Sequence, residues 1–228
     1  MKRETLEQLL NAQSARRAVA LVTSLDDGAE RVVALENAAD DQLCEYLEQA
    51  FRFDKSGVIS VEEGEFFINV YNPPLKMVLV GAVHIAQALI PMAQLAGFDV
   101  VVIDPRGAFA TDARFPGVEL HADWPDDVIP DIGLDPRTAM VALTHDPKID
   151  DPALTMALRS DVFYIGALGS KRTHAGRRER LGEHGFDEHT LNRICGPIGL
   201  DIGARGQAEI AISIMAEVVQ HLRLGAQA

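Results

Sequence analysis

Cysteine is scarce in this sequence, and long apolar runs are absent. The two cysteines, Cys44 and Cys195, lie far apart and form neither a C-x-x-C pair nor a zinc-type spacing, which argues against a disulfide scaffold and a zinc knuckle. No stretch approaches the roughly 18–20 apolar residues that a membrane-spanning helix requires. The first residues include Glu4 and Glu7 and lack an apolar core of signal-peptide length. We therefore expect a cytoplasmic protein without a membrane segment.

Positive charge is also in short supply. The chain has 21 Lys and Arg against 34 Asp and Glu, which gives a formal net charge of −13. Binding to nucleic acid or to anionic lipid needs clustered cations, so we expect neither partner. The 228 residues, 47% hydrophobic and 24% charged, are ordinary for a globular chain of one large or two small domains.

Residues 1–74 have the pattern of a small N-terminal α/β domain. Thr5–Gln13 and Ala39–Phe53 predict helices, the second because its apolar residues recur at three-and-four spacing. Two pairs of apolar runs around acidic Gly-containing turns predict β-hairpins. Their strands are Ala18–Thr23, Arg31–Leu35, Val58–Val61 and Phe66–Val70. The segment Asn72-Pro73-Pro74 can continue neither a strand nor a helix, so we place the domain boundary there.

Residues 75–228 alternate between predicted strands and helices. The strands are Lys76–Val80, Asp99–Ile103, Val118–His121, Ala139–Leu143 and Val162–Ile165, and the helices are His84–Ala96, Asp151–Arg159, Ser170–Glu183 and Gln207–Leu222. Such alternation is typical of a parallel sheet with helices on both faces. We predict an α/β fold with a doubly wound, Rossmann-like parallel sheet in this second domain.

The segment Val78–Leu89 has the pattern of a dinucleotide-binding unit. Gly81 ends a strand, a helix starts near His84, and Asp104 ends the next strand. In such a unit the glycine allows a tight turn, the helix N-terminus faces a pyrophosphate and the acid accepts hydrogen bonds from ribose hydroxyls. Val83 stands where a second glycine lets the backbone approach phosphate. The unit either binds NAD(P) or keeps the fold without the usual nucleotide pose.

Charged residues end the second predicted strand of this domain. Asp104 is a candidate acceptor for ribose hydroxyls, and Arg106 is a candidate partner for a phosphate. The alternative is a salt bridge between the two in a surface turn. Their position at the carboxyl end of a parallel strand favours ligand contact, because ligands gather there.

Thr144-His145-Asp146 follows another predicted strand at the same edge of the sheet. A histidine beside an aspartate serves as a general base, as a metal ligand or in a helix cap. Asp150 is a candidate N-cap for the helix that follows. All three interpretations stay open on the sequence.

A glycine-rich loop follows the last predicted strand and leads into a helix. Gly166, Gly169 and Ser170 precede the cations Lys171 and Arg172, a combination typical of an anion cradle at a helix start. The spacing is not that of a P-loop, so ATP hydrolysis is not implied. The alternative is a solvated helix whose arginines pair with neighbouring glutamates.

Five ordered segments resemble the C-terminal domain of the XdhC/CoxI family, the xanthine dehydrogenase accessory factors. The segments are GAVHIAQALIPMAQLAGFDVVVIDPR, TDARFPG, ALTHDPKIDDPAL, YIGALGSKRTHAGRRERL and PIGLDIGARGQAEIAISIMAEVV. The family's G-A-G-H is G-A-V-H here, so Val83 departs from the pattern. The Gly-Gly-Cys segment usual in the family's N-terminal domain is missing from residues 1–74, so a cofactor-ligating role does not transfer to Cys44.

The resemblance implies a non-catalytic chaperone that binds molybdenum cofactor and assists its sulfuration and insertion. The implied partners are a molybdenum hydroxylase such as xanthine dehydrogenase and a cysteine desulfurase, and the family also suggests a homodimer. The alternatives are an NAD(P)-dependent oxidoreductase and an interaction protein without a ligand. We expect the cofactor to contact Gly81, Ala82, His84, Asp104, Arg106, Thr144, His145, Asp146, Gly166, Gly169, Ser170, Lys171 and Arg172.

Overall fold

The structure of the chain is a computed structural model that describes residues 2–225. The chain divides into two compact units, Met1–Pro73 and Pro74–Ala228. Among the described residues, no helix is long and apolar enough to cross a bilayer.

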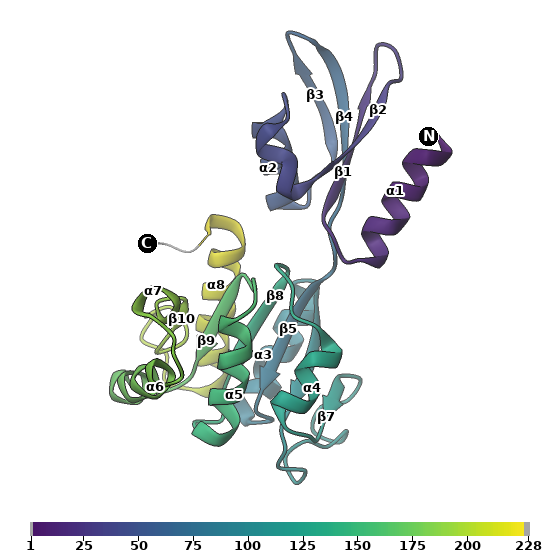
Figure 1. Ribbon diagram of the computed structural model, residues 1–228. Helices are drawn as coiled ribbons and strands as arrows, with labels where there is room; N and C mark the ends of the chain where they lie inside the picture. Colours follow the sequence, from purple (N-terminus) through teal and green to yellow (C-terminus); the bar gives the residue numbers. More distant parts are fainter. Residues whose placement is uncertain (1, 226–228) are drawn as a thin grey trace. The chain divides into compact units, whose positions relative to one another are not determined.

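The smaller unit is an antiparallel sheet with a helix on each face (Figure 1). Its elements are α1 (Arg3–Ser14), β1 (Val19–Ser24), β2 (Glu30–Ala34), the 3-10 helix η1 (Leu35–Asp40), α2 (Cys44–Phe53), β3 (Gly57–Val61) and β4 (Gly64–Tyr71). The strand order is β2-β1-β4-β3. Side chains alternate along β1, so that Ala20 and Val22 pack under α2 while Val19 and Leu21 pack under α1. Both predicted hairpins are confirmed.

The predicted start of one helix in this unit is wrong. The sequence predicts a helix over Ala39–Phe53, but the α-helix begins only at Cys44, after η1. Asp41 Oδ1 accepts a hydrogen bond from the Leu43 backbone N–H at 2.9 Å and pairs with Arg31 at 2.9 Å. This local side-chain bond offers the backbone an alternative to the helix, so the chain turns at Asp41.

The larger unit contains a 6-stranded parallel sheet of order β10-β9-β8-β5-β6-β7. Its elements are β5 (Leu75–Val80), α3 (His84–Leu95), β6 (Phe98–Ile103), β7 (Glu119–His121), α4 (Pro125–Ile132), β8 (Thr138–Ala142), α5 (Pro147–Leu158), β9 (Tyr164–Ala167), α6 (Lys171–Glu183), α7 (Glu188–Leu191), β10 (Ile194–Cys195) and α8 (Gln207–Leu224). From the central strand β5, the chain adds β6 and β7 towards one edge of the sheet. It then returns to the other side of β5 and adds β8, β9 and β10 towards the opposite edge. This is the strand order of a Rossmann fold, as predicted.

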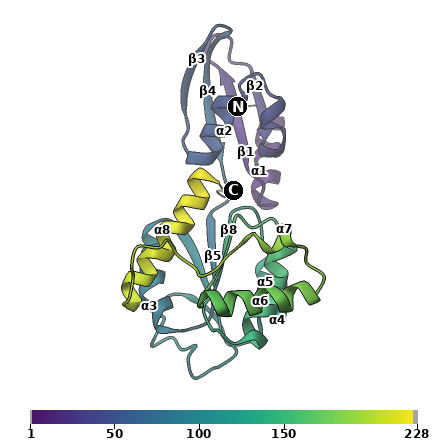
Figure 2. The same cartoon turned by 90° about the vertical axis from the view of Figure 1, so that its left-hand side faces the viewer.

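Helices cover both faces of this sheet, so the larger unit has three layers (Figures 1 and 2). Met77 and Leu79 of β5 face the layer of α3 and α8. Val78 and Val80 face the layer of α4 and α5. Because both faces are buried, the central strands are continuous apolar runs rather than alternating ones. Burial of apolar surface stabilises a fold by roughly 25 cal/mol per Å². The two clusters of buried side chains are therefore the main source of the domain's stability.

The structure corrects several predicted boundaries in the larger unit. Helix α5 begins at Pro147 and not at Asp151, with Asp146 as its N-cap. The predicted strand Val162–Ile165 lies at Tyr164–Ala167. The sequence does not predict α4, whose segment PDDVIPDI contains Pro130 and three aspartates and therefore has the composition of a turn. It also misses the very short α7 and β10.

Candidate functional site

The carboxyl ends of β5 and β8 lie side by side at the topological switch point, where the strand order of the sheet reverses. Ligands of doubly wound sheets bind in the crevice at this point. Gly81 follows β5 with a φ of +117°, a backbone conformation that residues with a side chain rarely adopt. A Cβ on Gly81 would lie 2.8 Å from Cγ2 of Thr144, which follows β8. The crevice is therefore filled by protein at its base.

The first turn of the larger unit has a valine where a dinucleotide-binding turn has its second glycine. Val83 is the N-cap of α3 in an extended conformation, and none of the described side chains caps that helix. The Val83 side chain is partly buried and packs against the core. It occupies the place where glycine would let a pyrophosphate approach the backbone. Ala82 is buried, whereas His84 is exposed at the helix start.

Asp104 is turned into the protein, with 0% of its surface exposed. Its Oδ2 accepts from the Ala82 N–H at 2.8 Å and from Arg106 Nη2 at 2.7 Å. Its Oδ1 accepts from the backbone N–H and Nε of Arg106 at 3.0 and 2.9 Å. Burial alone would raise the pKa of Asp104, but these hydrogen bonds hold the pKa below its ordinary value. The carboxylate therefore joins two turns and is not free to accept from a ribose.

Arg114 is a site residue that the motifs do not reveal. Its Nη1 donates to the carbonyl oxygens of Ala82 and Phe109, each at 2.8 Å. Its backbone oxygen accepts from Gln87 Nε2 at 3.3 Å. These bonds fasten the loop after β6 to the turn after β5. The segment TDARFPG contains the arginine, but its acceptors are distant backbone carbonyls, which no local pattern encodes.

Thr144 and His145 are held by Asp150, which is 1% exposed, and the Asp146 N–H donates to Thr144 Oγ1 at 3.1 Å. Asp150 Oδ1 accepts from Thr144 Oγ1 at 2.6 Å, and Oδ2 accepts from the His145 N–H at 3.0 Å. Burial raises the pKa of Asp150, although the Thr144 hydroxyl opposes this shift. His145 is exposed and has a φ of +65°. Asp146 caps α5, so the prediction of Asp150 as the N-cap is wrong.

The predicted anion cradle is only partly assembled. Gly166 is buried inside β9, where an added Cβ would lie 2.5 Å from the Tyr164 hydroxyl. Gly169, with a φ of +147°, lies in the loop before α6, and Ser170 caps that helix by accepting from the Thr173 N–H at 3.1 Å. Lys171 and Arg172 are exposed at the helix start, and neither forms an ion pair with any described residue.

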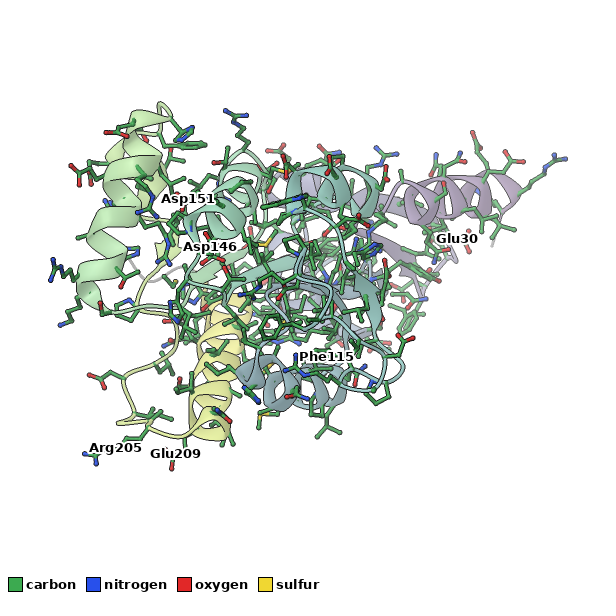
Figure 3. The ribbon with its side chains drawn as sticks, turned by 90° about the horizontal axis from the view of Figure 1, so that it is seen from below. Glu30, Phe115, Asp146, Asp151, Arg205 and Glu209 are labelled. Atoms are coloured by element: carbon green, nitrogen blue, oxygen red, sulfur yellow. The ribbon has the colours of Figure 1, made fainter. Side chains whose placement is uncertain are left out.

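The arginines farther along α6 pair with acids outside their own helix. Arg180 Nε donates to Asp151 Oδ2 at 2.7 Å, and Arg178 binds Glu188 of α7. The alternative of pairs with Glu179 and Glu183 is therefore wrong for these two arginines. In Figure 3, Asp146 and Asp151 lie on the side of the domain near α6, and Phe115 lies towards α3.

A second buried polar cluster, which no sequence motif reveals, lies where β9 meets α8. The Tyr164 hydroxyl donates to Glu217 Oε2, which also accepts from the Gly199 N–H at 2.8 Å. Cys195 Sγ lies 3.5 Å from His221 Nε2. Burial and the nearby Glu217 raise the pKa of Cys195 to about 12. Within residues 2–225, no three His, Cys, Asp or Glu side chains converge as a metal site.

Together these features define a Rossmann-like domain that has Val83 in place of the second glycine of its first turn and exposed cations at the start of α6. The sequence model of the XdhC Rossmann domain matches residues 77–218. The chain therefore belongs to the XdhC family, and the resemblance found in the sequence is confirmed.

Relatives and a solved structure agree with this assignment. The chain is 34% identical over 158 residues to a probable xanthine dehydrogenase subunit of Bacillus subtilis, covering 68% of this chain and 45% of the relative. It is 30% identical over 148 residues to the molybdenum cofactor insertion chaperone PaoD of Escherichia coli, covering 65% and 40%. The chain thus spans less than half the length of either relative.

The fold also matches a crystal structure described as a xanthine dehydrogenase from Bacillus halodurans. The TM-score is 0.67 and the identity 26%, over 99% of this chain and 66% of the other. The similarity therefore extends through the smaller unit, which the family match does not reach.

Proposed function

We propose that this chain binds molybdenum cofactor and assists its sulfuration and insertion into a molybdenum hydroxylase of the xanthine dehydrogenase type. The family and the relative named as an insertion chaperone support this role. The proposed partners are that hydroxylase and a cysteine desulfurase, and we propose a homodimer as the working form.

One observation carries the proposal: the predicted contact residues lie within the matched segment 77–218 and, apart from Gly166 inside β9, follow the carboxyl ends of neighbouring parallel strands. Lys171 and Arg172 are exposed there in a chain whose formal net charge is −13. Such a local excess of cations attracts an anionic ligand and leaves the rest of the surface repelling it.

The residues fit a phosphate-bearing pterin better than a dinucleotide. A pterin phosphate needs cations for its charge and polar groups near its ring, which Arg172, Lys171 and the exposed His145 provide. A dinucleotide in the usual pose needs an open glycine turn and a free acid for the ribose. Val83 replaces the glycine of that turn, and Asp104 is bound to Ala82 and Arg106. We therefore do not favour the oxidoreductase alternative.

The test is the molybdenum and pterin content of the chain purified anaerobically from a molybdenum-replete host. We expect both in equal amount, measured by mass spectrometry of the metal and by fluorescence of the oxidised pterin. Purified cofactor added to the empty chain should also bind, and the loaded chain should activate a cofactor-free xanthine dehydrogenase. A chain that is empty as purified and also refuses added cofactor would overturn the proposal and favour the ligand-free interaction protein.

A pair of variants examines the cations separately from the fold. Lys171→Ala combined with Arg172→Ala should weaken cofactor binding at least about tenfold, since each removes a charge-assisted contact. Arg159→Gln is the matched control, because Arg159 is also exposed but lies at the far end of α5. Equal cofactor affinity of the wild type, the double variant and the control would contradict the role of Lys171 and Arg172.

A further inference from the structure

A pocket of about 300 Å³ lies between α5 and α6, next to the edge described above. We call it the α5–α6 pocket. Three arginines and two aspartates form its charged lining, and His145 and Thr173 lie beside them: Arg172, Arg177, Arg180, Asp150 and Asp151. It is a local basic site in an acidic chain.

Arg177 is the central residue of this pocket, and it is only 2% exposed. Its Nη2 donates to the Leu168 carbonyl oxygen at 2.8 Å and lies 4.0 Å from Asp150 Oδ2. Its Nε and Nη1 are buried, and no described residue accepts a hydrogen bond from either. Buried donors are nearly always satisfied, and an unsatisfied one is costly, more so on a charged group. The Nε and Nη1 donors of the guanidinium therefore lack an acceptor among the described residues.

The two aspartates of the pocket do not supply that acceptor. Asp151 receives two hydrogen bonds from Arg180, at 2.7 and 3.0 Å. Asp150 receives the Thr144 hydroxyl and the His145 N–H, and burial raises its pKa. Arg180 is paired with Asp151 and Arg177 lies 4.0 Å from Asp150, so the excess positive charge of the lining belongs to Arg172, which forms no ion pair with any described residue. The hydrogen-bond donors without an acceptor belong to Arg177.

We propose that the α5–α6 pocket binds the phosphate group of a phosphate monoester, with Arg177 below it and Arg172 at its mouth. A tetrahedral oxyanion offers several acceptors to the planar N–H fork of an arginine. The lining has three arginines against two aspartates, and Thr173 is a further polar lining residue. The volume admits a phosphate with bridging waters. This inference rests on the proposed function, because it places the phosphate of the pterin cargo; free phosphate is the other source of the same group.

Binding of inorganic phosphate, followed by calorimetry and by ³¹P line broadening, tests the pocket itself. We expect saturable binding that Arg172→Gln weakens about tenfold, since one charge-assisted partner is lost. Arg177→Lys keeps the positive charge but removes the planar N–H fork of the guanidinium. It should therefore weaken phosphate binding by a similar factor. Arg178→Gln is the matched control, because Arg178 neighbours Arg177 but faces Glu188 and Asn192. If Arg177→Lys does not fold, the exposed Arg172 still decides the question. Equal phosphate affinity in the wild type, Arg172→Gln and the control would overturn the inference.

Cofactor binding distinguishes the two proposals. If the pocket holds the phosphate of the cargo, inorganic phosphate should compete with cofactor, and Arg172→Gln should weaken both. Arginine-dependent phosphate binding by a chain that refuses cofactor would support the pocket and overturn the proposed function. Cofactor binding that neither phosphate nor Arg172→Gln affects would support the proposed function and overturn the pocket as the place of the cargo's phosphate.

Discussion

Gly81 and Thr144 are in contact across the crevice between β5 and β8. A Cβ on Gly81 would approach Thr144 Cγ2 to 2.8 Å and the Thr144 backbone nitrogen to 3.3 Å. The first glycine of a dinucleotide-binding unit is usually explained by the tight turn that it allows. Here a threonine of the protein itself requires it.

Gly81→Ala should lower the free energy of unfolding by about 2–4 kcal/mol, through the positive φ and the contact with Thr144. Denaturant unfolding measures the change. Gly107→Ala is the control, because a Cβ there meets nothing within 4 Å. Adding Thr144→Ser removes the clashing methyl and should restore part of the loss. A Gly81→Ala protein as stable as the wild type would contradict the contact.

Asp104→Asn should cost about 2 kcal/mol at pH 7, because an amide cannot accept all the hydrogen bonds of the carboxylate. The pKa of Asp104 is lowered in the folded protein. Its ionised form therefore stabilises the fold above the ordinary value of 3.8, and this contribution is lost as the pH falls through the folded pKa. The difference between variant and wild type should shrink below about pH 4. Asp99→Asn, on the exposed side of β6, is the control, and a pH-independent difference for Asp104→Asn would be evidence against the ionic network.

Tyr164→Phe should destabilise the larger unit by about 1–3 kcal/mol, because buried Glu217 loses the hydroxyl that donates to it. Thermal unfolding followed by circular dichroism measures the effect. Tyr46→Phe provides the comparison, since Tyr46 is exposed on α2. An equal, negligible change in both variants would show that Glu217 does not depend on this hydrogen bond.

Cys195 should resist alkylation in the folded protein. With a pKa of about 12, only roughly one thiol in 10⁴ is ionised at pH 8, and the thiolate is the reactive form. In a Cys44→Ser variant, iodoacetamide should react with Cys195 at least about a hundredfold more slowly in buffer than in denaturant. Comparable rates in the two conditions would mean that Cys195 is not held in the buried environment.

The sequence predicts those parts of the fold that depend on local patterns. The run Val78–Val80 is apolar on both faces and is therefore typical of a buried strand, and Gly81 marks where it must turn. Helix α4 escaped prediction because Pro130 lies inside it, where a proline normally interrupts a helix, so the segment has the composition of a turn. Only Pro125 is at the tolerated first position.

The candidate site was predictable in its place but not in its contacts. Exposed Lys171 and Arg172 are recognisable because their charge stands out against an acidic chain. Arg114 and Arg177 are not recognisable from the sequence. Arg114 is defined by its hydrogen bond to a distant backbone carbonyl oxygen, and Arg177 by its burial beside Asp150. Asp104 has the right position for a ribose acceptor, and only the structure shows that Ala82 and Arg106 already occupy it.

The two carbonyl contacts of Arg114 have a consequence for ligand affinity. The bond to Ala82 joins the long loop after β6 to the turn after β5, and the bond to Phe109 holds the loop itself together. If the proposed cofactor binds at this edge, less conformational entropy of this loop is lost on association, because the protein already holds the loop. Releasing the loop with Arg114→Ala would therefore weaken binding through the conformational freedom of the unbound protein, even for a ligand that never touches the arginine.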